Sequence, residues 1–276
     1  MLTSLGDWTR STEGERRQLA IELAAALGAE WRPVPRLRGA HGLAAVLHVP
    51  SNIEFVAVPG GRFVAGVQPA DAELLRDLEW NEESSAEWLE SLGARAGGEV
   101  TVAPFLIARG PVLAGDAQRI AGDEAGWVTG NEDSPAAPIR FTKDQCTPIL
   151  AAFPWRLPTG HEWEWVARTG GTTAFLNGAT PDETESACKA LYSAAYDHEC
   201  ADAGINGFGV WGLPWGDWVA AAAAPRTPHA GRGGAAMLYP WQSDEIIMQL
   251  AGLGDDGCAN DEQNLRFALD LPPLAE

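Results

Sequence analysis

The chain has 276 residues, enough for one large domain or two small ones with a sizeable buried core. Its 38 acidic and 19 basic residues give a formal net charge of −19, and because such a surface repels phosphates we expect no nucleic-acid partner. No apolar stretch approaches the length of a membrane span, and the first residues lack the pattern of a secretory signal, so we expect a cytoplasmic protein without membrane contact.

The first fifty residues are predicted to form a helical extension. Thr12 and Glu15 have the spacing of a capping box, and apolar residues then recur at helical spacing until Gly28, which would end the helix. We expect this extension, residues 1–50, to pack on a domain formed by residues 51–276. Binding of a partner by the same helix is the alternative.

Strands and an acidic segment are predicted next. Residues 54–66 have the pattern of two strands joined by a Pro-Gly-Gly turn, and residues 100–107 have that of a further strand. Residues 71–93, rich in glutamate, are expected to form a helix or an acidic loop with a solvated face. Residues 114–138 are polar and glycine-rich.

Two further capping boxes predict helices in the second half of the chain. Thr142 and Thr159 each precede a Gln or Glu by three residues, and each is expected to begin a helix. The second helix should cover residues 160–168 and bury Trp163. Residues 172–205 show no regular pattern and are expected to form long surface loops.

The four cysteines predict no disulfide framework. Cys146, Cys188, Cys200 and Cys258 include no closely spaced pair, and in a reducing compartment we expect buried thiols. A disulfide between Cys188 and Cys200 is the alternative. The 12 tryptophans and 31 glycines suit a loop-rich fold whose core is filled by large rings.

Two segments carry candidate metal ligands. One glycine-bearing loop gathers hard oxygen donors, as calcium prefers, although without EF-hand spacing: Asp255, Asp256, Asn260 and Asp261. His198 and Cys200 would point the same way on a strand and are weak candidates for a transition metal, with His161 as a third ligand. Polar surface loops are the simpler interpretation, so calcium remains a candidate and no cofactor is predicted outright.

One segment has a recognisable pattern: Arg156-Leu157-Pro158-Thr159-Gly160-His161-Glu162-Trp163-Glu164-Trp165-Val166-Ala167-Arg168. Other patterned segments keep a fixed order around it, at residues 56–66, 102–112, 206–213, 232–234 and 265–268. Together they resemble the formylglycine-generating-enzyme (sulfatase-modifying factor) family, from about Ile53 to the C-terminus. The resemblance implies an α+β, C-type-lectin-like fold with short antiparallel strands and many ordered loops.

The chain departs from this family where the catalytic residues would lie. The two cysteines that bind Cu(I) in active members fall on Leu238 and Ser243, and neither side chain holds that soft ion. The asparagine and glutamate of the family's calcium-binding stretch fall on Gly216 and Val219, whereas its tryptophan is kept as Trp218. The resemblance therefore implies a pseudoenzyme without formylglycine-generating activity, and copper is not expected.

The strip that lines the family's peptide groove carries two rings, a hydroxyl and two carboxylates here: Tyr239, Trp241, Ser243, Asp244 and Glu245. Rings beside carboxylates suit a peptide, a protein or a cationic small molecule. Trp215 and Asp217 are expected on the opposite wall. Packing of Tyr239 and Trp241 in the core is the alternative.

We therefore expect a non-catalytic, cytoplasmic ligand- or protein-binding module. One alternative is an enzyme with a rebuilt site in the same groove, oxidising or modifying a peptide or small molecule with a different metal or none. Another is a subunit that needs a partner to complete its site. Elemental analysis of the purified protein would separate a metalloenzyme from a scaffold.

Overall fold

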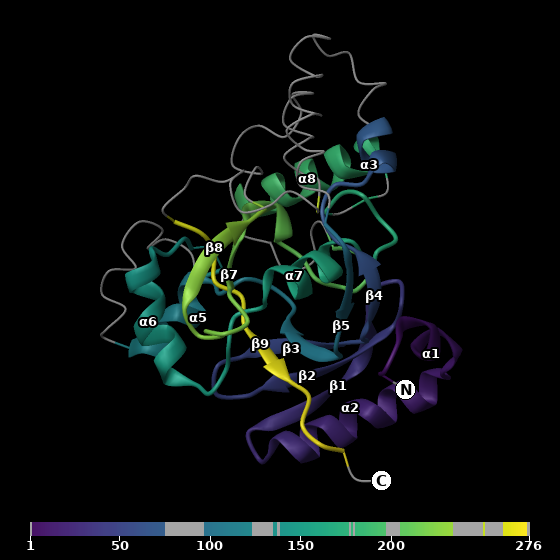
Figure 1. Cartoon of the computed structure of the whole chain (residues 1–276). Coiled ribbons are helices and arrows are strands. Elements are labelled where there is room, and N and C mark those ends of the chain that lie inside the picture. Colours follow the sequence, from purple (N-terminus) through teal and green to yellow (C-terminus); the bar gives the residue numbers. More distant parts are fainter. Residues whose placement is uncertain are drawn as a thin grey trace.

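The computed structural model describes residues 2–74, 97–122, 135–136, 139–176, 178, 180–196, 205–233, 251 and 262–274 (Figure 1). Its helices are α1 (Leu5–Arg10), α2 (Glu13–Leu27), α3 (Pro69–Glu73), α5 (Ala114–Ala121), α6 (Lys143–Ala152), α7 (Gly160–Ala167) and α8 (Pro181–Tyr196), with the short 3-10 helix η3 (Leu213–Trp215). None of the helices in these ranges is both long and apolar enough to cross a bilayer.

The described strands form antiparallel sheets. The largest has the order β1-β2-β3-β6-β9, and two pairs, β4-β5 and β7-β8, stand beside it. Their bounds are β1 (Trp31–Arg38), β2 (Leu43–His48), β3 (Ile53–Val58), β4 (Gly61–Val64), β5 (Glu99–Val102), β6 (Phe105–Ala108), β7 (Asp217–Ala220), β8 (Pro228–Arg232) and β9 (Ala268–Asp270). The chain is therefore a mixed α/β protein with antiparallel sheets.

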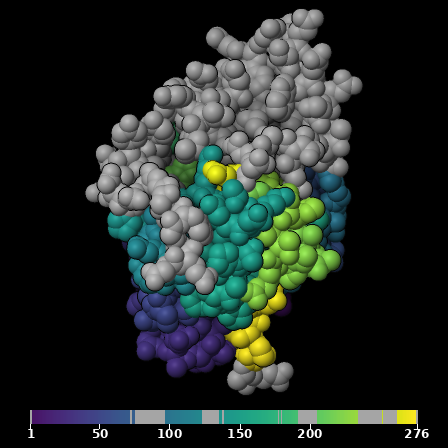
Figure 2. Space-filling model, turned by 90° about the vertical axis from the view of Figure 1, so that its left-hand side faces the viewer, coloured from purple at the N-terminus to yellow at the C-terminus, as the bar shows by residue number. Residues whose placement is uncertain are grey.

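The N-terminal segment is part of the main sheet. The predicted capping box at Thr12 is present and begins α2, which packs on β1 and β2 through its buried residues Leu19, Ala20, Leu23 and Ala24. Because β2 pairs with β3, the sheet continues across residue 50, where we predicted the end of a helical extension. Figure 2 shows the purple N-terminal residues packed directly against the blue and teal parts of the chain.

Two proline residues explain why β1 was not predicted. Pro33 and Pro35 interrupt the strand pattern, and proline is tolerated only where a strand lies at the edge of a sheet, as β1 does. The buried residues of α2 pack on β1 and β2, as expected for a segment that packs on the rest of the chain.

The strands predicted at residues 54–66 and 100–107 each divide between two sheets. The first ends at Pro59, so that β3 joins the main sheet and β4 pairs with β5. A side chain at Gly60 would lie 2.7 Å from the Val102 carbonyl oxygen, and one at Gly61 would lie 2.4 Å from the Trp165 ring. The Pro-Gly-Gly turn is therefore required by close packing.

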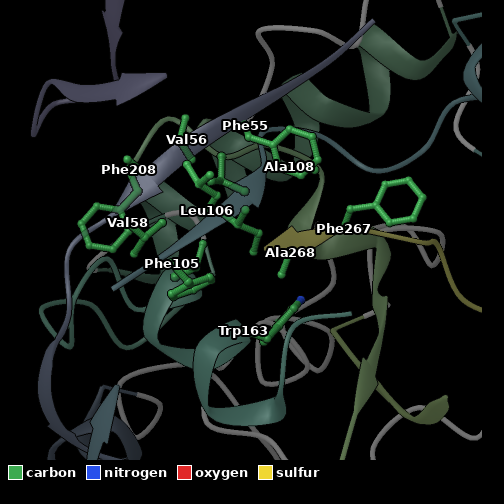
Figure 3. Packing of buried hydrophobic residues seen from close by; sticks show 14 of the residues in the cluster. Phe55, Val56, Val58, Phe105, Leu106, Ala108, Trp163, Phe208, Phe267 and Ala268 are labelled. Atoms are coloured by element: carbon green, nitrogen blue, oxygen red, sulfur yellow. The ribbon is translucent and has the colours of Figure 1, made fainter. Parts of the chain in front are cut away.

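Helix α7 (Gly160–Ala167) forms where the sequence predicted a helix over residues 160–168. Thr159 and Glu162 form the capping box, and Trp163 is buried. Figure 3 shows Trp163 reaching from α7 toward Ala268 of β9, near Leu106 and Phe105 of β6. The other tryptophan of this helix, Trp165, is buried too and donates its indole N–H to the Pro59 carbonyl at 2.9 Å.

Residues 181–196 form α8, where long surface loops were predicted. Thr180 accepts the Glu183 amide at 3.3 Å, and Pro181 occupies the first helical position, where its missing N–H costs nothing. Cys188 on this helix is a buried free thiol, so the alternative of a Cys188–Cys200 disulfide is wrong.

Two less regular segments are described in part. Of residues 71–93, the first three belong to α3, and of residues 114–138, the first eight form α5. Asp116 accepts the amide at the start of α5 and pairs with Arg119 at 2.8 Å.

Candidate functional site

Most of the predicted site residues lie outside the described residues. This holds for the groove strip, Tyr239, Trp241, Ser243, Asp244 and Glu245, and for Leu238. It holds also for the metal candidates Asp255, Asp256, Asn260, Asp261, His198 and Cys200. Trp215 and Asp217, predicted on the opposite wall, are described.

Asp217 begins β7 and is fully buried. Its Oδ2 accepts the indole N–H of Trp163 at 2.9 Å and the Nε–H of Arg266 at 2.8 Å. The side chain of Arg266 is buried as completely as that of Asp217. Asp217 is therefore part of a core ion pair and presents no exposed carboxylate to a groove.

The other guanidinium nitrogens of Arg266 are also used. Nη1 donates to the Ala108 carbonyl at 3.1 Å and Nη2 to the Trp211 carbonyl at 2.9 Å. One side chain thus joins β6, the segment before η3, and β7. Charge-assisted hydrogen bonds of this kind are what make a buried ion pair tolerable.

Trp215 is also buried, with 3% of its surface exposed. Its ring meets that of Trp211 edge-on, with centroids 5.8 Å apart. Asn264 fixes the backbone here by donating its side-chain amide to the carbonyls of Trp215 and Gly216, at 3.2 and 2.8 Å. Trp215 and Asp217 therefore lie beneath the surface of the described part of the chain.

We call the group formed by Trp163, Asp217, Asn264 and Arg266 the polar centre. Oδ1 of Asp217 and Oδ1 of Asn264 are buried and have no hydrogen-bond partner among the described residues. These two residues form a parallel bridge through their backbones. Because both oxygen atoms have essentially no accessible surface, a ligand would reach them only after the surrounding chain moves.

The polar centre lies beside Gly233. Gly233 is the last described residue before the predicted groove strip and has a positive φ of 74°. A side chain on Gly233 would lie 2.5 Å from the Leu213 carbonyl oxygen and 3.1 Å from the Trp163 ring. Gly233 is therefore packed tightly against Trp163 of α7.

A second buried network lies on the neighbouring side of α7. Glu164 Oε1 accepts the Gly66 amide at 2.8 Å and Arg168 Nε at 3.0 Å, and Arg168 Nη2 donates to Asp71 Oδ2 at 2.8 Å. Arg232 Nη1 lies 3.6 Å from Glu164 Oε2. Burial opposes the charge of Arg168, but hydrogen bonding to Asp71 and the charges of Asp71 and Glu164 outweigh it and raise the Arg168 pKa.

Two consecutive residues of α7 therefore belong to different buried groups. Trp163 lies in the polar centre, and Glu164 lies in the second network. The sequence marked this helix correctly but gave no sign of either network. Asp217, the partner of Trp163, and Gly66, one partner of Glu164, are distant in the chain. A pairing such as Asp217 with Arg266, 49 residues apart, leaves no local pattern.

One arrangement has the composition of a hydrolytic triad. Ser51 Oγ lies 2.8 Å from His48 Nδ1, and His48 Nε2 lies 3.5 Å from Glu30 Oε2. The exposures are the reverse of those that a nucleophile needs, because Ser51 is fully buried and the Glu30 side chain is 69% exposed. A substrate cannot reach Ser51 in this structure.

Within the described ranges, no three His, Cys, Asp or Glu side chains are grouped as a metal site. Cys146 and Cys188 are buried free thiols, and burial raises the pKa of each to about 12. These two thiols stay protonated at neutral pH, so they are poor metal ligands and poor nucleophiles.

No family model matches the chain, and no curated protein matches it. Among solved structures, it is similar to PvdO from Pseudomonas aeruginosa, with a TM-score of 0.47 and 19% identity over 80% of this chain and 95% of that one. It is also similar to Treponema denticola variable protein 1, with a TM-score of 0.46 and 13% identity over 88% of this chain and 100% of the other. At this level of similarity, neither likeness assigns a family or an activity.

Proposed function

We propose that the chain is a non-catalytic binding module with the C-type-lectin-like fold of the formylglycine-generating-enzyme family. The observation that carries the proposal is a contrast within the sequence. Leu238 and Ser243 stand where the copper cysteines of active members would be, whereas the residues of the family's patterned segments are kept. Several of them, such as Trp163 and Arg266, build the buried polar centre.

The polar centre is a buried group held by hydrogen bonds, as a structural role requires. Arg266 neutralises Asp217, so this carboxylate is an acceptor for the Trp163 and Arg266 N–H groups and is not free to move a proton. Gly233, the last described residue before residues 234–250, packs on Trp163. On this proposal, the buried Asp217 and Trp215 contribute to the folded core and do not contact the ligand.

Recognition on this proposal belongs to the strip from Tyr239 to Glu245. Its two rings supply contact area, and Asp244 and Glu245 supply negative charge. A ring next to carboxylates attracts a cationic or amphipathic group. The ligand class that fits is a peptide, protein segment or small molecule with a basic group.

The test uses a cysteine-containing peptide with a basic residue, incubated with the protein in the presence of copper. We expect the peptide to bind and to keep its mass, because the strip offers recognition groups but no soft ligand for Cu(I). Fluorescence anisotropy measures binding, and mass spectrometry measures conversion. An aldehyde product would contradict the proposal.

The double variant Trp241→Ala/Asp244→Ala should lose binding while its melting temperature stays near the parental value. Asp144→Ala is the matched control, because it removes an exposed carboxylate from α6, outside the strip. A folded double variant with parental affinity would rule out the strip as the binding surface. If the double variant unfolds, Asp244→Asn with the same readout replaces it.

A further inference from the structure

The last residue of β2, where the turn to β3 begins, is a buried histidine in an aromatic setting. The His48 side chain is 3% exposed. Its ring lies 4.9 Å from that of Trp31, 5.0 Å from Phe153 and 4.8 Å from Trp155, measured between centroids. Such surroundings disfavour a charged imidazolium, because they replace water with apolar rings.

Hydrogen bonds determine which nitrogen of His48 carries the proton. The backbone N–H of Ser51 points at Nδ1 from 3.4 Å, and the Ser51 hydroxyl lies 2.8 Å from the same atom. Nδ1 must therefore be the acceptor, and Nε2 carries the hydrogen. We assign this tautomer from the hydrogen-bond pattern.

Ser51 links the histidine to the rest of the turn. Its hydroxyl oxygen accepts the Ile53 amide at 3.3 Å, at the start of β3. Its carbonyl oxygen accepts Nη1 of Arg119 on α5 at 2.9 Å. Asn52, the next residue, has a positive φ of 59°, which an ordinary side chain adopts only when its neighbours hold it there.

Two charged groups face this turn among the described residues. Glu30, in the connection between α2 and β1, lies 3.5 Å from Nε2 and is mostly exposed. Arg119 approaches from α5 through the Ser51 carbonyl, and its Nη1 also pairs with Asp116 at 2.8 Å, a carboxyl whose pKa burial raises. The remaining neighbours, Ile53 and the rings of residues 153–155, are apolar or aromatic.

We propose that residues 48–52 form an acid-sensitive latch between the main sheet and α5, which opens when His48 is protonated. A proton on Nδ1 removes the acceptor of the Ser51 amide. The Ser51 hydroxyl can then bond Nδ1 only as an acceptor, with its own hydrogen directed at the His48 carbonyl 3.5 Å away. The turn then loses the Ser51 amide bond next to Asn52, whose positive φ the neighbouring residues hold in place. The Arg119 contact is on the same residue, so α5 loses its tie to the sheet.

The direction of the pH effect follows from burial. Burial lowers the His48 pKa below its usual value of 6.5, and the hydrogen bond and charge of Glu30 only partly offset this. Above the usual value, both the folded and the unfolded chain hold a neutral histidine. As the pH falls below it, the unfolded chain binds a proton that the latch resists, so stability is lost toward acid pH.

The test measures amide hydrogen exchange and histidine titration by NMR on the full-length protein. Between pH 7 and about pH 5, the protection factors of the Ser51 and Ile53 amides should fall, and His48 should titrate below its usual pKa of 6.5. The variant His48→Asn places a carboxamide oxygen near the Nδ1 position and cannot titrate. Its Ser51 amide should keep pH-independent protection.

Two controls separate this latch from other histidines. His161 is exposed, so His161→Asn should leave the exchange of Ser51 unchanged. Burial, followed by the charge of Arg16, also lowers the pKa of His41. His41→Asn should therefore weaken the pH dependence of the free energy of unfolding and leave the protection of the Ser51 amide unchanged. Constant protection of Ser51 across this pH range, or a His48 pKa at or above its usual value, would overturn the proposal even if His48→Asn does not fold.

Discussion

Neither Asp217 nor Arg266 can lose its partner without leaving a charge in the core. Both side chains are fully buried, and their bond is 2.8 Å long. Removing one member of such a pair typically costs more than the pair contributes, because the other charge is stranded away from water. This ion pair therefore holds β6, β7 and the C-terminal segment together.

We predict that Arg266→Met lowers the free energy of unfolding by about 3–5 kcal/mol, the usual cost of breaking a buried pair. Adding Asp217→Asn should recover part of this loss. The asparagine carries no charge and still offers an oxygen to the Trp163 indole. Urea denaturation of the parent, both single variants and the double variant measures the coupling. Losses that simply add would show that the two side chains act independently.

Sequence reasoning failed at the residue scale for the same physical reason. Asp217 was predicted as a groove residue because its neighbours match a known motif, and nothing nearby indicated a partner 49 residues away. Glu164 and Arg168 bond each other four residues apart, but their further partners Gly66 and Asp71 are distant in the chain and were not foreseen. Partners that meet through the fold leave no trace in a local pattern.

At the scale of single elements, capping boxes were the most dependable sequence signal. All three that we predicted are formed, at Thr12, Thr142 and Thr159. The capping interaction depends only on residues three positions apart, so the tertiary structure need not be known. The start of α8 had the related signal of Thr180 before Pro181, which the search for apolar periodicity missed.

Strands were harder to predict because their identity depends on the sheet that they join. The proline residues of β1 suit an edge position that only the complete sheet reveals. Residues 100–107 are continuous in pattern, yet β5 and β6 belong to different sheets. Pattern alone located these segments but could not assign their partners.

The caps at Thr12 and Thr159 allow a matched comparison. Thr159→Ala should destabilise the protein by about 0.5–2 kcal/mol, as capping substitutions do. Its partner Glu162 is also paired with Arg156 at 2.7 Å, in a part-buried setting. Thr12→Ala should cost less, because Thr12 and Glu15 are exposed. Equal shifts in melting temperature for the two variants would show that the Arg156 contact adds nothing to the cap.

At the scale of the whole molecule, the acidity of the chain is unevenly distributed. Residues 75–96, 123–134, 197–204, 234–250 and 252–261 hold 18 of the 38 acidic residues and 2 of the 19 basic ones. The described residues are consequently close to charge balance. Repulsion between like charges therefore opposes their folding only weakly. Composition alone, which gave −19 for the chain, could not reveal this division.

The main sheet also determines how the N-terminal segment contributes to stability. Trp8 donates its indole N–H to the His41 carbonyl at 3.0 Å, and Arg16 lies over the Trp8 ring while it donates to the same carbonyl at 2.9 Å. The His41 amide donates in turn to the Gly207 carbonyl at 3.1 Å. These bonds join residues near the N-terminus to the second half of the chain, so we expect one cooperative unfolding unit.

Leu23 and Ile21, two residues apart on α2, test this expectation. Leu23 is fully buried against the sheet, whereas Ile21 is 51% exposed. Leu23→Ala should lower the free energy of unfolding by about 2–5 kcal/mol, and Ile21→Ala should change it by less than about 0.5 kcal/mol. Thermal unfolding followed by both circular dichroism and tryptophan fluorescence should show a single transition that moves as a whole in Leu23→Ala. An early transition confined to the helical signal would mean that α2 unfolds separately and that residues 1–50 are an extension after all.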